Sequence, residues 1–224
     1  MKLDKTVILF IAALAIASTG CQSMQSGKKQ SMISGMVYDL DNKPVTEAIV
    51  VLNGKIIATT DINGHFSISG LSQNTLYSIA FNKLKYEPVE MTFTYTDPAQ
   101  VIYVNMSSGS QLIAMAEKSL KASEWQKTAK YLDRAEKSEC DQVESAYLRA
   151  SLQYRQKEYG KAYEIIVKLI ESGEDDPNIL LFAADICQYK MNDVANARLY
   201  LKKFLSITYE PDVESRLGAL ANQE

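Results

Sequence analysis

The sequence predicts two domains of different class in series: a seven-stranded antiparallel β-sandwich, then an α-helical solenoid of about three helix pairs with a capping helix. Residues 32–107 contain short runs rich in Val, Ile, Thr, Tyr and Phe, separated by turn residues. From Gln111 onward Pro and Gly become rare, and apolar residues recur at helical spacing. Residues 110–222 also repeat with a period of about 34 residues.

The overall composition is that of ordinary globular domains. Apolar residues make up 46% and charged residues 23% of the 224 residues, which suits two domains that each bury a core. The formal net charge is -3, and no run of Lys or Arg alternates with aromatic residues. Because nucleic-acid binders need a basic surface, we expect no nucleic-acid partner.

Residues 1–20 have the composition of a signal peptide. Lys2 and Lys5 precede an apolar run at residues 7–17. This run is shorter than the roughly 20 apolar residues that a membrane-spanning helix needs. We therefore interpret it as the apolar core of a signal peptide.

The apolar run ends in Ser18-Thr19-Gly20-Cys21. This ending resembles the lipobox of bacterial lipoproteins, and the resemblance implies that Cys21 is diacylated and becomes the mature N-terminus. The family usually has Leu where this chain has Ser18. Cleavage after residues 15–17, an A-x-A sequence, is the alternative and would leave a soluble protein.

A flexible tether is predicted at residues 21–31, which contain Gln, Ser, Gly and Lys and very few apolar residues. Some surface-exported lipoproteins have an acidic cluster directly after the cysteine, and this chain has none there. We therefore expect a lipid-anchored protein of the cell envelope, on the outer membrane and facing the periplasm.

The β-rich part has seven predicted strands, at 33–38, 48–52, 55–60, 65–69, 76–82, 88–95 and 101–105. Turn residues separate them, and Asn53-Gly54 between two β-rich runs is a specific hairpin signal. Alternate residues of the strands can face a core between two sheets, which favours a sandwich.

These strands and turns also follow a longer pattern, in this order: Gly35-x-Val37-x-Asp39, Pro44-Val45, Ala48-x-Val50-x-Leu52, Thr60-Asp61-x-x-Gly64-x-Phe66-x-Ile68, Leu71 and Tyr77-x-Ile79. The pattern resembles the carboxypeptidase regulatory-like domain. The resemblance implies a seven-stranded, transthyretin-like sandwich that acts as a non-catalytic interaction module. It does not imply peptidase activity, because fold alone does not determine function.

No metal site, cofactor or catalytic group is predicted. Asp61 and Asn63 are interpreted as turn residues and His65 as a strand residue facing solvent. Cys187 lies in an apolar helix pattern, so a buried thiol is expected in preference to a disulfide with Cys140. With no CxxC motif and a single histidine, a zinc site is not expected.

The repeat is visible in pairs of residues. Asp176-Pro177 and Glu210-Pro211 lie 34 residues apart, and Tyr154 and Tyr189 lie 35 apart. A period near 34 with Pro between units resembles the tetratricopeptide repeat. We predict helix pairs at 110–123 with 125–138, 142–156 with 159–172 and 178–191 with 193–207, and a capping helix at 212–221.

This repeat departs from the family at a position that usually holds Gly or Ala. Ala150 occupies it in the middle unit, whereas Glu117 and Asp185 occupy it in the outer two. We therefore expect the outer pairs to pack less regularly.

Such arrays hold partners along the inner faces of the first helices. In the second unit Tyr147, Ser151, Tyr154 and Arg155 share one face by helical spacing. Corresponding positions are Phe182, Ile186, Tyr189 and Lys190 in the third unit, and Lys118 and Lys121 in the first.

We predict a partner-binding surface at these positions, suited to an acidic or C-terminal peptide. The alternative is that the aromatic side chains only pack between helices.

Taken together, these features predict a non-enzymatic lipoprotein that acts as a protein–protein adaptor in an envelope complex. Its partner would be an outer-membrane protein or an acidic peptide segment. The alternative is a carbohydrate or cell-wall binder that uses exposed aromatics of the sandwich, such as Tyr86, Tyr95 or Tyr103, with the helices as a spacer. Asp175 and Asp176 are assigned to capping the next helix, and residues 107–110 are expected to form a flexible joint.

Overall fold

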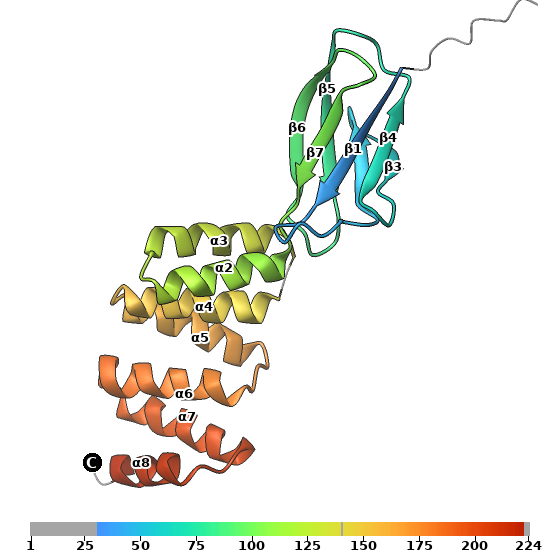
Figure 1. The fold of residues 1–224 in the computed structure, drawn as a ribbon. Helices are drawn as coiled ribbons and strands as arrows, with labels where there is room; N and C mark the ends of the chain where they lie inside the picture. The colour runs from blue at the N-terminus through green and yellow to red at the C-terminus, as the bar shows by residue number, and fades with distance from the viewer. Residues whose placement is uncertain (1–30, 140, 222–224) are drawn as a thin grey trace, which may run out of the picture.

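Seven strands and then seven α-helices follow one another along residues 31–139 and 141–221, the part of the chain that this computed structural model describes. The β-rich part and the helical part lie end to end (Figure 1). The predicted order of a β domain followed by an α domain is therefore confirmed. The predicted signal peptide, Cys21, most of the predicted tether and Cys140 lie outside the described residues.

The strands form two sheets. One has the order β4-β1-β7 and the other the order β3-β2-β5-β6. Their buried side chains form one shared core, in which Phe66 and Phe81 meet edge to face at 5.2 Å between ring centroids. The strand bounds are β1 Met32–Tyr38, β2 Ile49–Leu52, β3 Lys55–Thr59, β4 His65–Ser69, β5 Thr75–Asn82, β6 Val89–Tyr95 and β7 Val101–Asn105.

One strand pair corrects the predicted all-antiparallel sandwich. β1 and β7 pair in parallel, in a register that runs from Ser34 opposite Val101 to Tyr38 opposite Asn105. Hairpin signals define the direction of strands that are neighbours in sequence, and these two strands are separated by the rest of the domain. As a result the described chain begins at one end of the sandwich and leaves it at the other, beside the helices (Figure 1).

The turns form where the sequence predicted them. Asn53 and Gly54 both have positive φ, 46° and 79°, in the hairpin between β2 and β3. In the next turn a carboxylate oxygen of Asp61 accepts backbone hydrogen bonds from Asn63 at 2.8 Å and His65 at 2.9 Å. These bonds lower the pKa of Asp61 and show that it stabilises a turn.

The helices form three successive hairpins and a terminal helix. Pairs α2/α3, α4/α5 and α6/α7 pack together, and the hairpins stack through α3 on α4 and α5 on α6, with α8 against α7. The bounds are α2 Gly109–Lys121, α3 Trp125–Lys137, α4 Gln142–Arg155, α5 Tyr159–Glu171, α6 Pro177–Ile186, η1 Cys187–Met191, α7 Val194–Ile207 and α8 Pro211–Ala221.

The helical part has the predicted period. The first helix of each hairpin and α8 begin at residues 109, 142, 177 and 211, a step of about 34 residues. Asp176 caps α6 as expected, because its carboxylate accepts from the backbone N–H of Asn178 at 2.7 Å. Within the described residues, no helix is both long and apolar enough to cross a bilayer.

The joint between the two parts is not the flexible linker that its Ser and Gly content suggested. Ser108 caps α2, and its side chain and that of Gln111 form a reciprocal capping box. The backbone N–H of Gly109 donates to Lys85 at 2.9 Å, and that of Glu87 donates to Ser107 at 2.8 Å. The composition of residues 107–110 therefore reflects a helix start that pairs with the loop between β5 and β6.

Candidate functional site

A hollow of about 390 Å³ opens on the helical array. We call it the groove. It is formed by α2, α4 and α6, the first helices of the three hairpins. Its lining residues are Glu117, Leu120, Lys121, Tyr147, Leu148, Ser151, Tyr154, Arg155 and Phe182.

Five side chains predicted for the partner-binding surface line the groove together: Lys121, Tyr147, Tyr154, Arg155 and Phe182. They come from three helices that are far apart in sequence. Stacking of the hairpins brings them together, because the repeat places equivalent positions on the same side of the array. The structure therefore gathers these five residues into one surface.

An aromatic cluster forms one wall of the groove. Phe182 lies between Tyr147 and Tyr154, with ring centroids 5.6 Å and 5.5 Å away, and Tyr154 also meets Tyr159 at 5.3 Å. All three contacts have interplanar angles above 60° and are edge to face, an arrangement that aromatic quadrupoles favour.

The rings of this cluster are half-buried and pack against the core of the array. Each of Tyr147, Tyr154 and Phe182 also lines the hollow. The same rings thus pack against the core and line the groove, two roles that the sequence left as alternatives.

Cations border the aromatic wall. Arg155 is exposed at the end of α4 and forms no ion pair or side-chain hydrogen bond with the rest of the described chain. Lys190 lies over the rings of Tyr154 and Tyr159, at 5.6 Å and 5.3 Å from their centroids. Lys121 pairs with Glu117 at 2.6 Å, and both side chains are at least half exposed. Such exposed pairs exchange readily with other partners.

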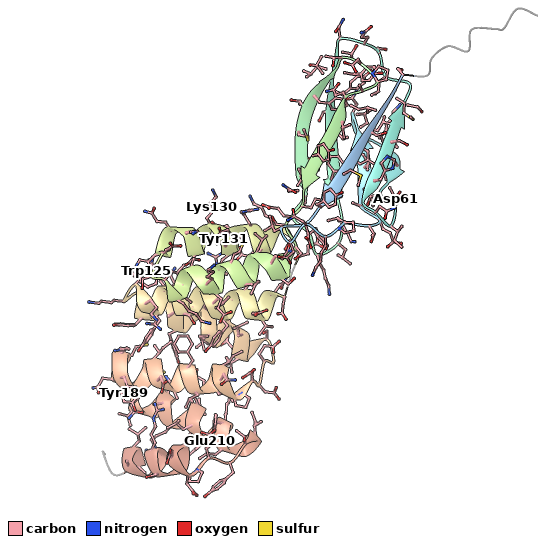
Figure 2. All side chains as sticks on the ribbon, in the orientation of Figure 1. Asp61, Trp125, Lys130, Tyr131, Tyr189 and Glu210 are labelled. Carbon is pink, nitrogen blue, oxygen red and sulfur yellow. The ribbon has the colours of Figure 1, made fainter. Side chains whose placement is uncertain are left out.

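The structure places two predicted residues elsewhere. Lys118 borders a separate hollow with Lys127 and Tyr131. Tyr189, which Figure 2 labels, is 60% exposed. Its ring centroid lies 4.9 Å from the guanidinium of Arg216 on α8.

The position of Tyr189 has a local cause. Residues Cys187–Met191 form a π-helix, in which backbone bonds run from i to i+5. The face on which Tyr189 lies was predicted from the spacing of an α-helix, and that spacing does not hold in a π-helix. Ile186, assigned to the same face, is fully buried in the core.

A second hollow adjoins the groove and was not predicted. It has a volume of about 390 Å³ and is lined by Asp141, Val143, Glu144, Tyr147, Asp176, Asn178 and Ile179. Asp141 and Asp176 cap the starts of α4 and α6. Their spacing of one repeat in the sequence is the signal that could have located this acidic side.

Tyr147 lies at the boundary between the two hollows and lines both. Its pKa is raised, first because burial disfavours the phenolate and then because of the negative charges of Asp176 and Asp185. The two hollows therefore differ in charge: the groove is lined by the cations Lys121 and Arg155 and one carboxylate, Glu117, whereas the second hollow is lined by carboxylates and no cation.

The three tyrosines considered for carbohydrate binding do not form one surface. Tyr103 is 71% exposed on β7, whereas Tyr95 is buried in the sandwich core. Tyr86 is half-buried near the joint, with the Lys83 ammonium 5.2 Å from its ring centroid. In residues 31–139 and 141–221, no group of three or more His, Cys, Asp or Glu side chains could hold a metal ion.

A scan against protein families and a search of curated proteins find no match. Among solved structures, the chain is similar to the N-terminal domain of stress-induced protein-1 from C. elegans, with a TM-score of 0.46 and 16% identity over 51% of this chain and 94% of that one.

Two further solved structures are similar. The TPR2AB-domain:pHSP90 complex of yeast Sti1 has a TM-score of 0.45 and 17% identity over 51% of this chain and 46% of that one. The major pilin subunit of Bacillus cereus has a TM-score of 0.28 and 18% identity over 36% and 29%.

Proposed function

We propose that this protein is a non-enzymatic adaptor lipoprotein of a bacterial cell envelope. Lipid at Cys21 attaches it to the outer membrane, on the periplasmic side. The sandwich connects the tether to the helical array, and the groove of the array holds a segment of a protein partner. The helical part is a tetratricopeptide-like array in this proposal, and the sandwich a carboxypeptidase regulatory-like domain.

The observation that carries the proposal is the groove itself. Five side chains from α2, α4 and α6 combine half-buried aromatic rings with accessible cations in one hollow. Aromatic rings and Arg dominate the binding energy of many interfaces, because they bury a large area with little loss of conformational freedom. A surface of this composition suits a protein segment better than a small polar molecule.

The positions at which the chain enters and leaves the sandwich support the anchoring part of the proposal. The described chain starts at the end of the sandwich that is remote from the helices (Figure 1). An anchor attached there would hold the groove at a distance from the membrane, where a partner could reach it.

The experiment is capture of partners by the tagged full chain from envelope membranes in mild detergent, followed by mass spectrometry. A Tyr154→Ala variant removes a ring at the centre of the aromatic cluster. A Tyr103→Ala variant removes an exposed tyrosine from the sandwich and serves as the matched control. Circular dichroism should show that both variants remain folded.

We expect a stoichiometric protein partner that is retained by the Tyr103→Ala variant and lost from the folded Tyr154→Ala variant. Equal capture by both variants and the unsubstituted chain would remove the groove from the proposal. Glycan that is captured by the unsubstituted chain and by Tyr154→Ala, and lost only from Tyr103→Ala, would support the carbohydrate-binding alternative.

A further inference from the structure

Three basic residues recur at equivalent places in the helical array. Lys121 is the last residue of α2, Arg155 is the last residue of α4, and Lys190 lies in the last turn of the π-helix that continues α6. They are 34 and 35 residues apart in the sequence, which matches the step between the hairpins. We call Lys121, Arg155 and Lys190 the basic ladder.

The three cations of the basic ladder lie along one surface. Lys121 and Arg155 line the groove with Tyr154, and Lys190 lies over the ring of that same tyrosine. Tyr154 therefore connects all three positions. Stacking against two rings orients the Lys190 ammonium without neutralising it, because a ring quadrupole carries no net charge.

The charges of the basic ladder are accessible. Arg155 has no ion-pair partner in the described part of the chain, and the Glu117 partner of Lys121 is 51% exposed. The carboxylates of Asp141, Glu144 and Asp176 lie beyond Tyr147, in the adjacent hollow. The groove is lined by two cations and one carboxylate, Glu117, whereas the carboxylates of the adjacent hollow have no cation among its lining residues. An acidic ligand is thus attracted to the groove and repelled from the adjacent hollow.

We propose that the groove takes an extended acidic segment of a protein partner, with carboxylates at every third residue that pair with the steps of the basic ladder. Packed helices lie about 10 Å apart, and a segment in the polyproline II conformation advances about 3.1 Å per residue with three residues per turn. Every third side chain of such a segment therefore lies on the same face and meets a successive step. An apolar side chain between two carboxylates reaches the rings of Tyr147, Tyr154 and Phe182.

This inference rests on the proposed function, since it names the chemistry of the segment that the groove holds. The basic ladder also has a purely structural explanation. Cations at helix C-termini interact favourably with the helix dipole. That explanation predicts a change of stability when a cation is removed, and no selectivity for the spacing of carboxylates in a ligand.

The test measures fluorescence anisotropy of labelled synthetic peptides with the full chain in mild detergent. One peptide has three Glu residues separated by Ser-Leu pairs. A second has the same composition with the three Glu residues adjacent, and a third replaces each Glu of the spaced peptide by Lys. The protein variants are Lys121→Gln, Arg155→Gln and Lys190→Gln, with Lys130→Gln as the control.

Lys130 is an exposed cation on α3 and does not line the groove (Figure 2). Its substitution removes the same charge from the same domain. It therefore separates an effect of the basic ladder from an effect of net charge.

We expect the spaced Glu peptide to bind about tenfold more tightly than the adjacent isomer, and each ladder variant to weaken binding by about threefold to tenfold. Lys130→Gln should change affinity less than twofold, by about 0.4 kcal/mol at most. Added salt should lower the affinity of the spaced Glu peptide more than that of the other peptides, because its three charge pairs with the protein are all screened. The Lys peptide should not bind.

Equal affinity for the spaced and adjacent peptides would overturn the proposal, as would no binding of the spaced peptide up to about 1 mM. If capture of a partner still depends on Tyr154 in that case, the groove keeps its function and only the basic ladder is rejected. If capture is also independent of Tyr154, both proposals fail.

Discussion

Arg134 on α3 binds the carboxylate of Glu87, which lies in the loop between β5 and β6 of the sandwich. The guanidinium donates from Nε and Nη2 to Oε2 at 3.0 Å and 2.7 Å, and Nη2 also donates to the hydroxyl of Ser107 at 3.0 Å. The hydrogen bond to Glu87 raises the pKa of Arg134. This cluster links the two domains at the residues where the chain passes from one to the other.

Replacement of Arg134 by Gln is expected to loosen the joint. The side chains of Arg134 and Glu87 are 31% and 19% exposed, so loss of the guanidinium leaves a largely buried carboxylate without its partner. We expect a loss of about 1–2 kcal/mol at the joint. Hydrogen exchange should then accelerate at the amides of Glu87 and Gly109, which donate across the joint.

Arg149→Gln is the matched control for this prediction. Arg149 also forms a bidentate cluster, but its partners Asp133 and Glu136 both belong to α3 of the helical array. Its loss should affect the contact between α3 and α4 and leave exchange at Glu87 and Gly109 unchanged. Faster exchange at the joint in both variants would show that Arg134 has no special role there.

Gly35→Ala is expected to destabilise the sandwich. Gly35 lies on β1 opposite Phe66 of β4, and a Cβ added to Gly35 would overlap the Phe66 ring and the backbone oxygen of Ile102. Phe66 is 2% exposed and has little room to move. We expect a loss of about 2 kcal/mol or more in the free energy of unfolding, measured by chemical denaturation.

Gly160→Ala provides the comparison. An added Cβ at Gly160, in α5, meets no atom within 4 Å. Alanine favours the helix there, so the substitution should be neutral or stabilising by up to about 1 kcal/mol. Similar losses in both variants would indicate that crowding at Phe66 is not the cause.

Cys21→Ser tests the membrane anchor. If Cys21 is lipidated, mass spectrometry of the intact chain should show an N-terminal diacylated cysteine, and the protein should fractionate with membranes. The Ser variant should lack the lipid and appear in the soluble fraction. A mature chain that begins after residues 15–17 without lipid would instead support the A-x-A cleavage.

Local signals explain why much of the fold could be predicted. Asn53-Gly54, Asp61 and Asp176 act within a few residues of themselves, through positive φ or through hydrogen bonds to nearby N–H groups. Their structural effect therefore depends little on the rest of the molecule. The helix period is equally local, since it is set by spacing along the chain.

The features that could not be predicted depend on distant contacts. The direction of β1 relative to β7 is decided when the whole sandwich closes, and the order of the joint depends on Glu87 and Arg134, which are 47 residues apart. The π-helix at Cys187–Met191 shifts Tyr189 away from the groove. The spacing of 35 residues between Tyr154 and Tyr189 is one residue longer than the period of about 34. The spacing alone does not show which helix contains the extra residue.

The parallel pairing of β1 with β7 has a mechanical consequence. The predicted tether precedes β1 in the sequence, and the helical array follows the end of β7, so the two attachments would lie at opposite ends of the same strand pair. A pull between an anchored N-terminus and a partner in the groove would load these strands in shear. The backbone hydrogen bonds of this ladder, between the pairs Ser34–Val101 and Tyr38–Asn105, would then share the load. An antiparallel pair held at one end would instead open one bond at a time.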